Sequence, residues 1–221
     1  EIVMIKSKDV KILINHQKLD QLRLKYQPAL FLDRDGVIIK EKHYLKEPNL
    51  VELELGIKAL INKSLKANWL IVIITNQSGI DKGLFGWKEY EQVTNQMLNL
   101  LGKNNCPTAI YANSQAFQKT NNCWRKPSPN MLFQASKDLN IDLRKSILIG
   151  DRLSDLKAGI NAGLLKTYHL ASGHGKKERK EVLKYISKLS DEGKKNKFTK
   201  NLCIDSLMDL PNNLFRTNLN D

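Results

Sequence analysis

Cysteine is scarce in this chain of 221 residues, and the three that occur are scattered and odd in number. A disulfide framework needs paired cysteines, so the chain is expected to fold in a reducing compartment, the cytoplasm. No apolar run approaches the roughly 20 residues that a membrane-spanning helix needs. The first residues alternate charged with apolar side chains, so no secretory signal is expected there. These absences favour a globular protein of the cytoplasm that has no membrane partner.

Negative charge is in deficit, with 23 Asp or Glu against 36 Lys or Arg and a formal net charge of +13. Much of the excess lies in residues 174–200, which hold ten Lys or Arg and four Asp or Glu. Apolar residues recur there at helical spacing, which predicts a solvated amphipathic helix with lysine edges. A patch that attracts phosphate or nucleic acid is the alternative. The interpretation adopted is a monomer without a nucleic-acid partner.

Short apolar runs alternate with helical patterns from residue 29 onward, which is typical of a doubly wound, mostly parallel α/β sheet. One helix has Ser128 as its expected cap and Pro129 at its first helical position. The expected strands span residues 29–32, 70–74, 108–111, 146–149, 165–169 and 201–204. The expected helices span residues 56–66, 87–101, 128–139 and 153–161.

The two ends of the chain lie outside this alternation of strands and helices. We expect an N-terminal extension of unknown role over residues 1–28, one domain over 29–212 and a C-terminal tail over 213–221. Within the extension, VKILI is a candidate edge strand and LDQLRLKY a candidate short helix.

Reactive side chains follow the expected strands, at the edge of a doubly wound sheet where ligands bind. Asp33 and Asp35 follow the first strand, in FLDRDGVII, and Thr75 follows the second. Asp151 follows the fourth, and Lys126 ends the long loop after the third. Carboxylates so close together need a positive partner, and hard oxygen ligands favour Mg²⁺. With a hydroxyl and a lysine to hold phosphoryl oxygens, this set indicates phosphoryl transfer through an aspartyl-phosphate.

The motifs DRDGVI, TNQSGI, RKPSPNM and GDRLSD, in this order, resemble those of the haloacid dehalogenase superfamily of phosphatases. The residues within these motifs are similar to those of the group that contains D,D-heptose 1,7-bisphosphate phosphatase and the histidinol-phosphate phosphatases. That resemblance implies a Rossmann-like fold with short loops and no cap domain. It also implies a Mg²⁺-dependent phosphoric monoester hydrolase acting on a small phosphorylated sugar.

By this resemblance Asp33 is the nucleophile and Asp35 is the acid that protonates the leaving oxygen and later activates water. Thr75 and Lys126 hold the phosphoryl group, and the Mg²⁺ ligands are Asp33, the carbonyl of Asp35 and Asp151. Asp155 supports the lysine. The substrate-binding candidates are Arg125, Asn76, Gln77, Ser78, Glu41, Tyr44 and Arg152.

Relatives in this group usually hold a structural zinc in the loop after the third strand. Here the four matching positions are Ala112, Ser114, Asn122 and Trp124. A single thiol, Cys123, cannot supply the set of four ligands that structural zinc requires, so no zinc is expected. Burial of the Trp124 ring is a candidate replacement for zinc in fixing this loop.

Among substrates, D-glycero-D-manno-heptose 1,7-bisphosphate is expected, with loss of its 7-phosphate. Histidinol phosphate is the immediate alternative. A polynucleotide 3′-phosphatase would match the positive charge, but no kinase motif or aromatic stacking platform accompanies it. A different class remains open as well, a basic nucleic-acid-binding or scaffold protein built on an inactive phosphatase core.

Overall fold

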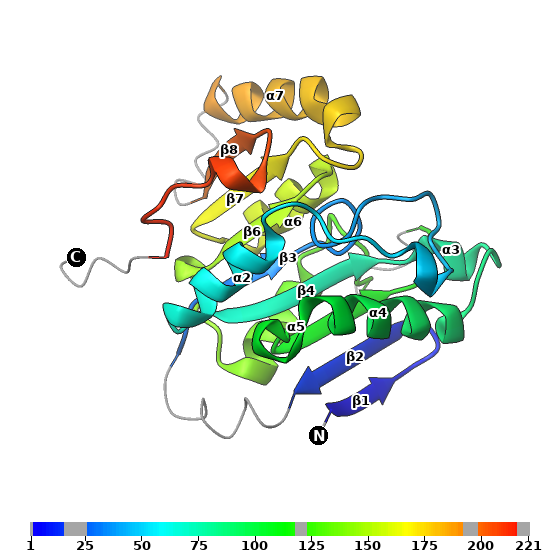
Figure 1. The fold of residues 1–221 in the computed structure, drawn as a ribbon. Helices are drawn as coiled ribbons and strands as arrows, with labels where there is room; N and C mark the ends of the chain where they lie inside the picture. The colour runs from blue at the N-terminus through cyan, green and yellow to red at the C-terminus, as the bar shows by residue number, and fades with distance from the viewer. Residues whose placement is uncertain (1, 16–25, 118–122, 192–198, 216–221) are drawn as a thin grey trace.

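An eight-stranded sheet forms the centre of the computed structural model, which describes residues 2–15, 26–117, 123–191 and 199–215 (Figure 1). The strand order is β1-β2-β5-β4-β3-β6-β7-β8, and all neighbours from β5 to β8 are parallel. The strands are β1 (Ile2–Lys6), β2 (Val10–Asn15), β3 (Ala29–Leu32), β4 (Leu70–Asn76), β5 (Ala109–Asn113), β6 (Ile147–Gly150), β7 (Lys166–Leu170) and β8 (Lys200–Ile204). The predicted doubly wound, mostly parallel sheet is therefore confirmed.

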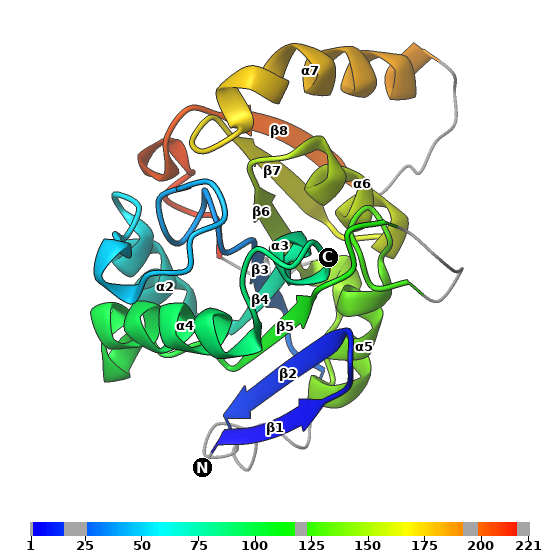
Figure 2. The ribbon, with the colours of Figure 1, turned by 90° about the vertical axis from the view of Figure 1, so that its right-hand side faces the viewer.

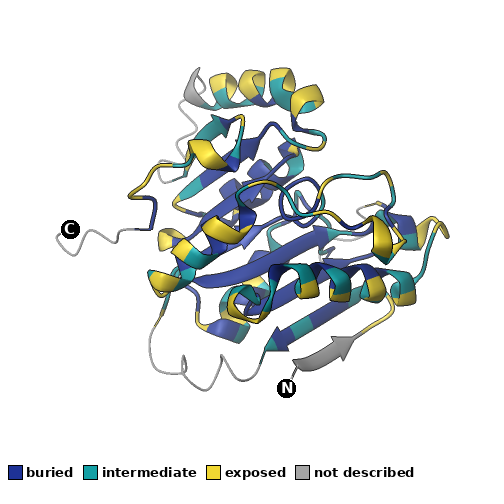
Figure 3. Cartoon of the chain, viewed as in Figure 1, coloured by how far each residue is buried: buried dark blue, intermediate teal, exposed yellow. Residues whose placement is uncertain are grey.

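Helices cover both faces of the sheet, as Figure 2 shows with α2 and α4 on one side and α5 and α6 on the other. The helices are α2 (Ile57–Lys66), α3 (Ser78–Asp81), α4 (Trp87–Leu101), α5 (Asn130–Leu139), α6 (Leu153–Ala162) and α7 (Gly175–Asp191). The lysine-rich α7 packs against β7 and α6, and its outward side is exposed (Figure 3). Among the described residues, no helix is both long and apolar enough to cross a membrane.

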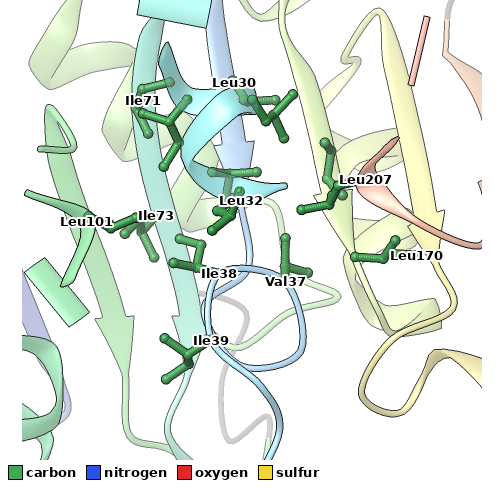
Figure 4. Close-up of a cluster of buried hydrophobic side chains, with 14 of the residues drawn as sticks. Leu30, Leu32, Val37, Ile38, Ile39, Ile71, Ile73, Leu101, Leu170 and Leu207 are labelled. Carbon is green, nitrogen blue, oxygen red and sulfur yellow. The ribbon is translucent and has the colours of Figure 1, made fainter. Parts of the chain in front are cut away.

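The core has two halves because successive side chains of a strand point to opposite faces. In β3, Leu30 and Leu32 join the half under α2 and α4, part of which is drawn in Figure 4. Ala29 and Phe31 join the half under α5 and α6. With both faces covered, all four residues of β3 are buried, which holds the strand rigidly where it delivers the residues that follow it.

The N-terminal residues that the structure describes extend the sheet. The β2 strand, which contains the predicted VKILI strand, pairs antiparallel with β5, and β1 pairs antiparallel with β2. Lys11 of β2 is buried, forms an ion pair with Glu91 of α4 and lies 5.4 Å from the centre of the Trp87 ring. The hairpin is thus fastened to α4 as well as to β5. The helix expected over LDQLRLKY lies almost entirely outside the described residues.

Most element boundaries agree with the sequence to within two residues, but the residue that caps α5 differs. The helix begins at Asn130, so Pro129 occupies the cap position expected for Ser128. The Ser128 hydroxyl still accepts a hydrogen bond from the backbone N–H of Asn130, at 3.3 Å. At the other end of the chain, Phe215 is buried and its ring meets that of Trp69, with 5.1 Å between ring centres.

Gly159 of α6 allows the helix to pack closely on β7. A β-carbon at this position would lie 2.5 Å from Cγ2 of Thr167 and 3.2 Å from Cδ2 of Leu148. Gly159→Ala should therefore destabilise the protein by about 1–3 kcal/mol in urea unfolding, because overpacking outweighs the better helix propensity of alanine. Adding Thr167→Ser removes Cγ2 and should restore most of the loss. A Gly159→Ala protein as stable as the wild type would contradict this close packing.

Candidate active site

The turn after β3 brings Asp33 to the carboxyl edge of the sheet. The backbone N–H of Asp33 bonds to the carbonyl of Ile149, at 3.1 Å, which ties this end of β3 to β6. Gly36 then turns the chain with a φ of 84°. A β-carbon at Gly36 would lie 2.5 Å from Oδ2 of Asp151, so the site needs glycine for both its conformation and its size.

Lys126 places a buried positive charge beside Asp33. Its Nζ lies 2.9 Å from Oδ1 of Asp33 and 2.6 Å from Oδ1 of Asp155, and it donates to the carbonyl of Ile74 at 3.1 Å. The residue is only 3% exposed. Burial alone would lower the pKa of Lys126, but Asp155 and Asp33 outweigh it, so the net pKa is raised. Lys126 is therefore a permanent cation, and Asp155 supports it as expected.

Residues at the end of β4 hold this arrangement in place. The Asn76 amide clasps the backbone of Lys126, with Oδ1 accepting from its N–H at 3.1 Å and Nδ2 donating to its carbonyl at 3.2 Å. Thr75 is buried, and its Oγ1 accepts a hydrogen bond from Nε2 of Gln77 at 2.7 Å. Both amide groups are therefore engaged within the protein, and substrate contact by Asn76 and Gln77 remains a prediction.

A divalent cation fits the buried carboxylates. Oxygen atoms of Asp33, Asp151 and Asp155 lie within 4.8 Å of one another. Oδ1 of Asp151 has no hydrogen-bond partner among the described residues. Burial and the neighbouring carboxylates raise the pKa values of Asp33 and Asp151 well above the usual range. Hard, crowded oxygen donors of this kind suit Mg²⁺, which would favour their charged forms.

The turn after β7 closes over Asp151. The backbone N–H of His174 donates to Oδ2 of Asp151 at 2.7 Å, and the Ser172 hydroxyl bonds to the carbonyl of Gly36. A β-carbon at Gly173 would lie 2.4 Å from the same Asp151 oxygen. The turn of residues 172–174 is therefore bonded both to the carboxylate cluster and to the turn after β3.

A cavity of about 490 Å³ opens beside these groups. Asp33, Asp35 and Lys126 line it, while Thr75 and Asp151 lie buried behind its wall. The expected substrate-binding residues also line the cavity: Arg125, Asn76, Gln77, Ser78, Glu41, Tyr44 and Arg152. The structure thus gathers the whole predicted site around one opening.

Tyr44 and Arg125 show how the cavity wall is built. Tyr44 has a φ of 54°, a conformation that costs energy for a tyrosine, and its hydroxyl lies 2.5 Å from Nζ of Lys82. Arg125 is half-buried and donates from Nη1 to the carbonyl of Gln115 at 3.1 Å. Burial first, and the nearby charge of Arg152 second, lower the pKa of Arg125. Two like charges therefore face the same opening.

Lys82 and His174 are among the lining residues that the sequence interpretation missed. Nε2 of His174 lies 3.5 Å from Oε1 of Glu41, across the cavity mouth. His174 follows a parallel strand, so the strand-end rule already applied to Asp33 would have placed it here. Lys82 carried no comparable signal, because it comes after the short helix α3 rather than at a strand end.

The loop after β5, where the resemblance predicted the loss of a zinc site, is packed through Trp124 and Cys123. The Trp124 ring lies 6.1 Å from that of Tyr111, centre to centre. The buried Cys123 thiol donates to Oε1 of Gln115 at 2.9 Å, and its sulfur accepts from the backbone N–H of Arg125 at 3.3 Å. The expected anchoring by Trp124 agrees with this packing. Residue 122 lies outside the described chain, and the absence of zinc remains a prediction.

Comparison with known proteins assigns the family. Residues 29–195 match the family described as polynucleotide kinase 3 phosphatase. The chain is 36% identical over 176 residues to D-glycero-beta-D-manno-heptose-1,7-bisphosphate 7-phosphatase of Pasteurella multocida, covering 73% of this chain and 94% of that protein. The corresponding protein of Helicobacter pylori is 38% identical over 138 residues, which are 61% of this chain and 78% of that one.

Solved structures agree with this assignment. A HAD-like phosphatase from Mesorhizobium loti superposes with a TM-score of 0.69 at 29% identity, covering 84% of this chain and 96% of that one. The D,D-heptose 1,7-bisphosphate phosphatase of B. bronchiseptica, complexed with magnesium and phosphate, superposes with a TM-score of 0.65 at 26% identity. The match covers 81% of this chain and 93% of that one. The chain therefore belongs to the haloacid dehalogenase superfamily of phosphatases, and it is a phosphoric monoester hydrolase. Within that superfamily it is related to the D,D-heptose 1,7-bisphosphate phosphatases.

Asp151→Asn should separate metal binding from folding. Because burial raises the pKa of Asp151, its charged form destabilises the metal-free fold, and the neutral amide should raise the melting temperature without metal. The same change should remove most of the stabilisation that Mg²⁺ gives the wild type, measured by thermal unfolding across a Mg²⁺ titration. Equal stabilisation of both proteins by Mg²⁺ would exclude Asp151 as a ligand.

Proposed function

We propose that the protein is a Mg²⁺-dependent phosphatase that removes the 7-phosphate of D-glycero-D-manno-heptose 1,7-bisphosphate in the cytoplasm. The observation that carries this proposal is the placement of Asp33. Its carboxylate lines the cavity, 2.9 Å from the buried Lys126 ammonium and beside the Asp151 carboxylate. A nucleophile, a phosphate-binding cation and a metal-ligand cluster therefore meet at one point.

The chemistry assigned to the site has two steps. In the first, a carboxylate oxygen of Asp33 attacks phosphorus, the bond from phosphorus to the sugar oxygen breaks, and Asp35 gives that oxygen a proton. In the second, water attacks the phosphorus of the acyl phosphate, Asp35 takes its proton, and inorganic phosphate leaves with Asp33 restored. Lys126 and Thr75 hold the phosphoryl oxygens in both steps. Bound Mg²⁺, held by Asp33, Asp151 and the Asp35 carbonyl, would neutralise charge and orient the phosphate.

The cavity favours a substrate that carries a second negative charge. Among the described residues, Arg125 has no carboxylate partner, and Arg152 and Lys82 line the same opening. A second phosphate would suit these cations, whereas the ammonium group of histidinol phosphate would be repelled by them. The relatives named above bear the name of heptose bisphosphate 7-phosphatases, which supports the same choice.

A panel of substrates tests this proposal. Phosphate release is measured with Mg²⁺ from heptose 1,7-bisphosphate, histidinol phosphate and an oligonucleotide with a 3′-phosphate. We expect the highest kcat/KM on the heptose bisphosphate and no turnover by Asp33→Asn, because an amide cannot form the acyl phosphate. A preference for the oligonucleotide would instead give the lysine-rich α7 a substrate role. Turnover by Asp33→Asn at the wild-type rate would exclude the proposed nucleophile.

Arg125→Ala tests the source of specificity. The change should reduce kcat/KM for heptose bisphosphate by about 1.5–3 kcal/mol of transition-state stabilisation, the range for a hydrogen bond to a charged group. Small phosphate esters without a second phosphate should be turned over as before. Because Arg125 also braces the loop through the Gln115 carbonyl, an equal loss on both substrates would assign it a structural role instead.

A further inference from the structure

Arg34, which lies between the two aspartates of the first motif, is almost fully buried although it carries a full charge. Its side chain is 1% exposed. The guanidinium grips the Asp35 carboxylate with two parallel hydrogen bonds, from Nε to Oδ2 and from Nη2 to Oδ1, both 3.1 Å long. This fork geometry fixes both the position and the plane of a carboxylate. Neither the nucleophile nor the metal ligands require such a group, so its burial needs another reason.

Gln77 completes the hold on Asp35 from the other side. Its Nε2 donates to Oδ2 of Asp35 and to Oγ1 of Thr75, each at 2.7 Å, and its Oε1 accepts from Nη2 of Arg34 at 3.0 Å. Every polar atom of this side chain is thus engaged, and the residue is only 4% exposed. Gln77 links the Asp35 carboxylate to the hydroxyl that is assigned to the phosphoryl group.

Helix α4 anchors the far side of Arg34. The guanidinium carbon lies 5.0 Å from the centre of the Tyr90 ring, and Nη1 lies 3.4 Å from Oγ1 of Thr94. Burial lowers the pKa of Arg34, but Asp35 first and then Tyr90 raise it, so that the net pKa is raised. Arg34 therefore stays charged, and its contacts with Tyr90 and Thr94 attach the network to α4.

We propose that Arg34 and Gln77 are positioning residues that hold the Asp35 carboxylate in its orientation for proton transfer. The Asp35 side chain is 22% exposed and borders the cavity, so without these partners it would be free to rotate away from the reacting oxygen. The inference rests on the proposed function, in which Asp35 is the acid and then the base. It also moves Gln77 from the substrate-binding residues to the supporting network.

An activated ester isolates the step that this network serves. In 4-nitrophenyl phosphate the leaving oxygen is weakly basic, so transfer of the phosphoryl group to Asp33, with release of 4-nitrophenolate, needs little help from an acid. Hydrolysis of the acyl phosphate still needs Asp35 to remove a proton from water. Loss of the positioning residues should therefore slow the second step far more than the first. The acyl phosphate would then accumulate.

The test is rapid mixing of the Mg²⁺-loaded Gln77→Leu protein with 4-nitrophenyl phosphate. We expect a burst that approaches one 4-nitrophenolate per chain, followed by a steady state about 10- to 100-fold slower than that of the wild type. This loss is smaller than the full contribution of a general acid–base group, about 10²- to 10⁴-fold, because Asp35 itself is still present. Arg34→Lys, which keeps the charge but loses the fork, should give the same burst. Gln92→Leu makes the same chemical change on an exposed part of α4 and should leave both phases unchanged.

Asp35→Asn provides the reference that separates this inference from the proposed function. If Asp35→Asn itself gives no burst, the proposed role of Asp35 is wrong. If it gives a burst and both Gln77→Leu and Arg34→Lys slow the two phases equally, the network supports the fold or phosphate binding, and the inference is overturned. In the Asp35→Asn background, Gln77→Leu should cause almost no further loss, because the group that it positions is already disabled.

Discussion

The buried ammonium of Lys126 is the interaction on which the site depends. Asp33 and Asp155 lie on either side of it, and Asp155 has no exposed surface at all. Removing one member of a buried ion pair typically costs about 3–5 kcal/mol, because the remaining charge has no solvent to receive it. The two hydrogen bonds between the Asn76 amide and the Lys126 backbone help to keep the ammonium beside both carboxylates. These bonds join the loop before α5 to the end of β4, which limits movement of the Lys126 side chain away from the carboxylates.

The crowding around Asp151 explains why the surrounding backbone is so constrained. Gly36 comes from the turn after β3 and Gly173 from the turn after β7, yet a β-carbon on either would touch the same Asp151 oxygen. Two chain segments thus approach the carboxylate as closely as backbone can. Asp151 has no exposed surface, and the backbone N–H of His174 donates to its Oδ2. A cation is then the natural partner for the remaining oxygen.

The sequence was sufficient for the parallel strands and for the residues at their ends, because both depend on local patterns. Apolar runs mark the strands, and Asp33, Thr75 and Asp151 follow them directly. What the sequence could not supply is the direction in which side chains point. Gln77 and Asn76 stand where substrate ligands stand in the pattern, but tertiary packing turns their amides toward Asp35 and Lys126. The bond from the His174 backbone N–H to Asp151 likewise leaves no trace in local composition, although the position of His174 after a parallel strand does place it near the site.

The inward direction of these two amides limits how the cavity can recognise its substrate. Groups already bonded within the protein at 2.7–3.2 Å would lose those bonds if they turned to a ligand. Selectivity is therefore expected from the outer wall, where Arg125 and Arg152 each bond to the protein through Nη1 but carry further guanidinium donors. Lys82, which bonds to the Tyr44 hydroxyl, adds charge there, and His174 faces Glu41. These residues come from separate loops rather than from the sheet. The phosphoryl-transfer centre is consequently rigid, and substrate preference can change through the loops without disturbing the buried pair that the chemistry requires.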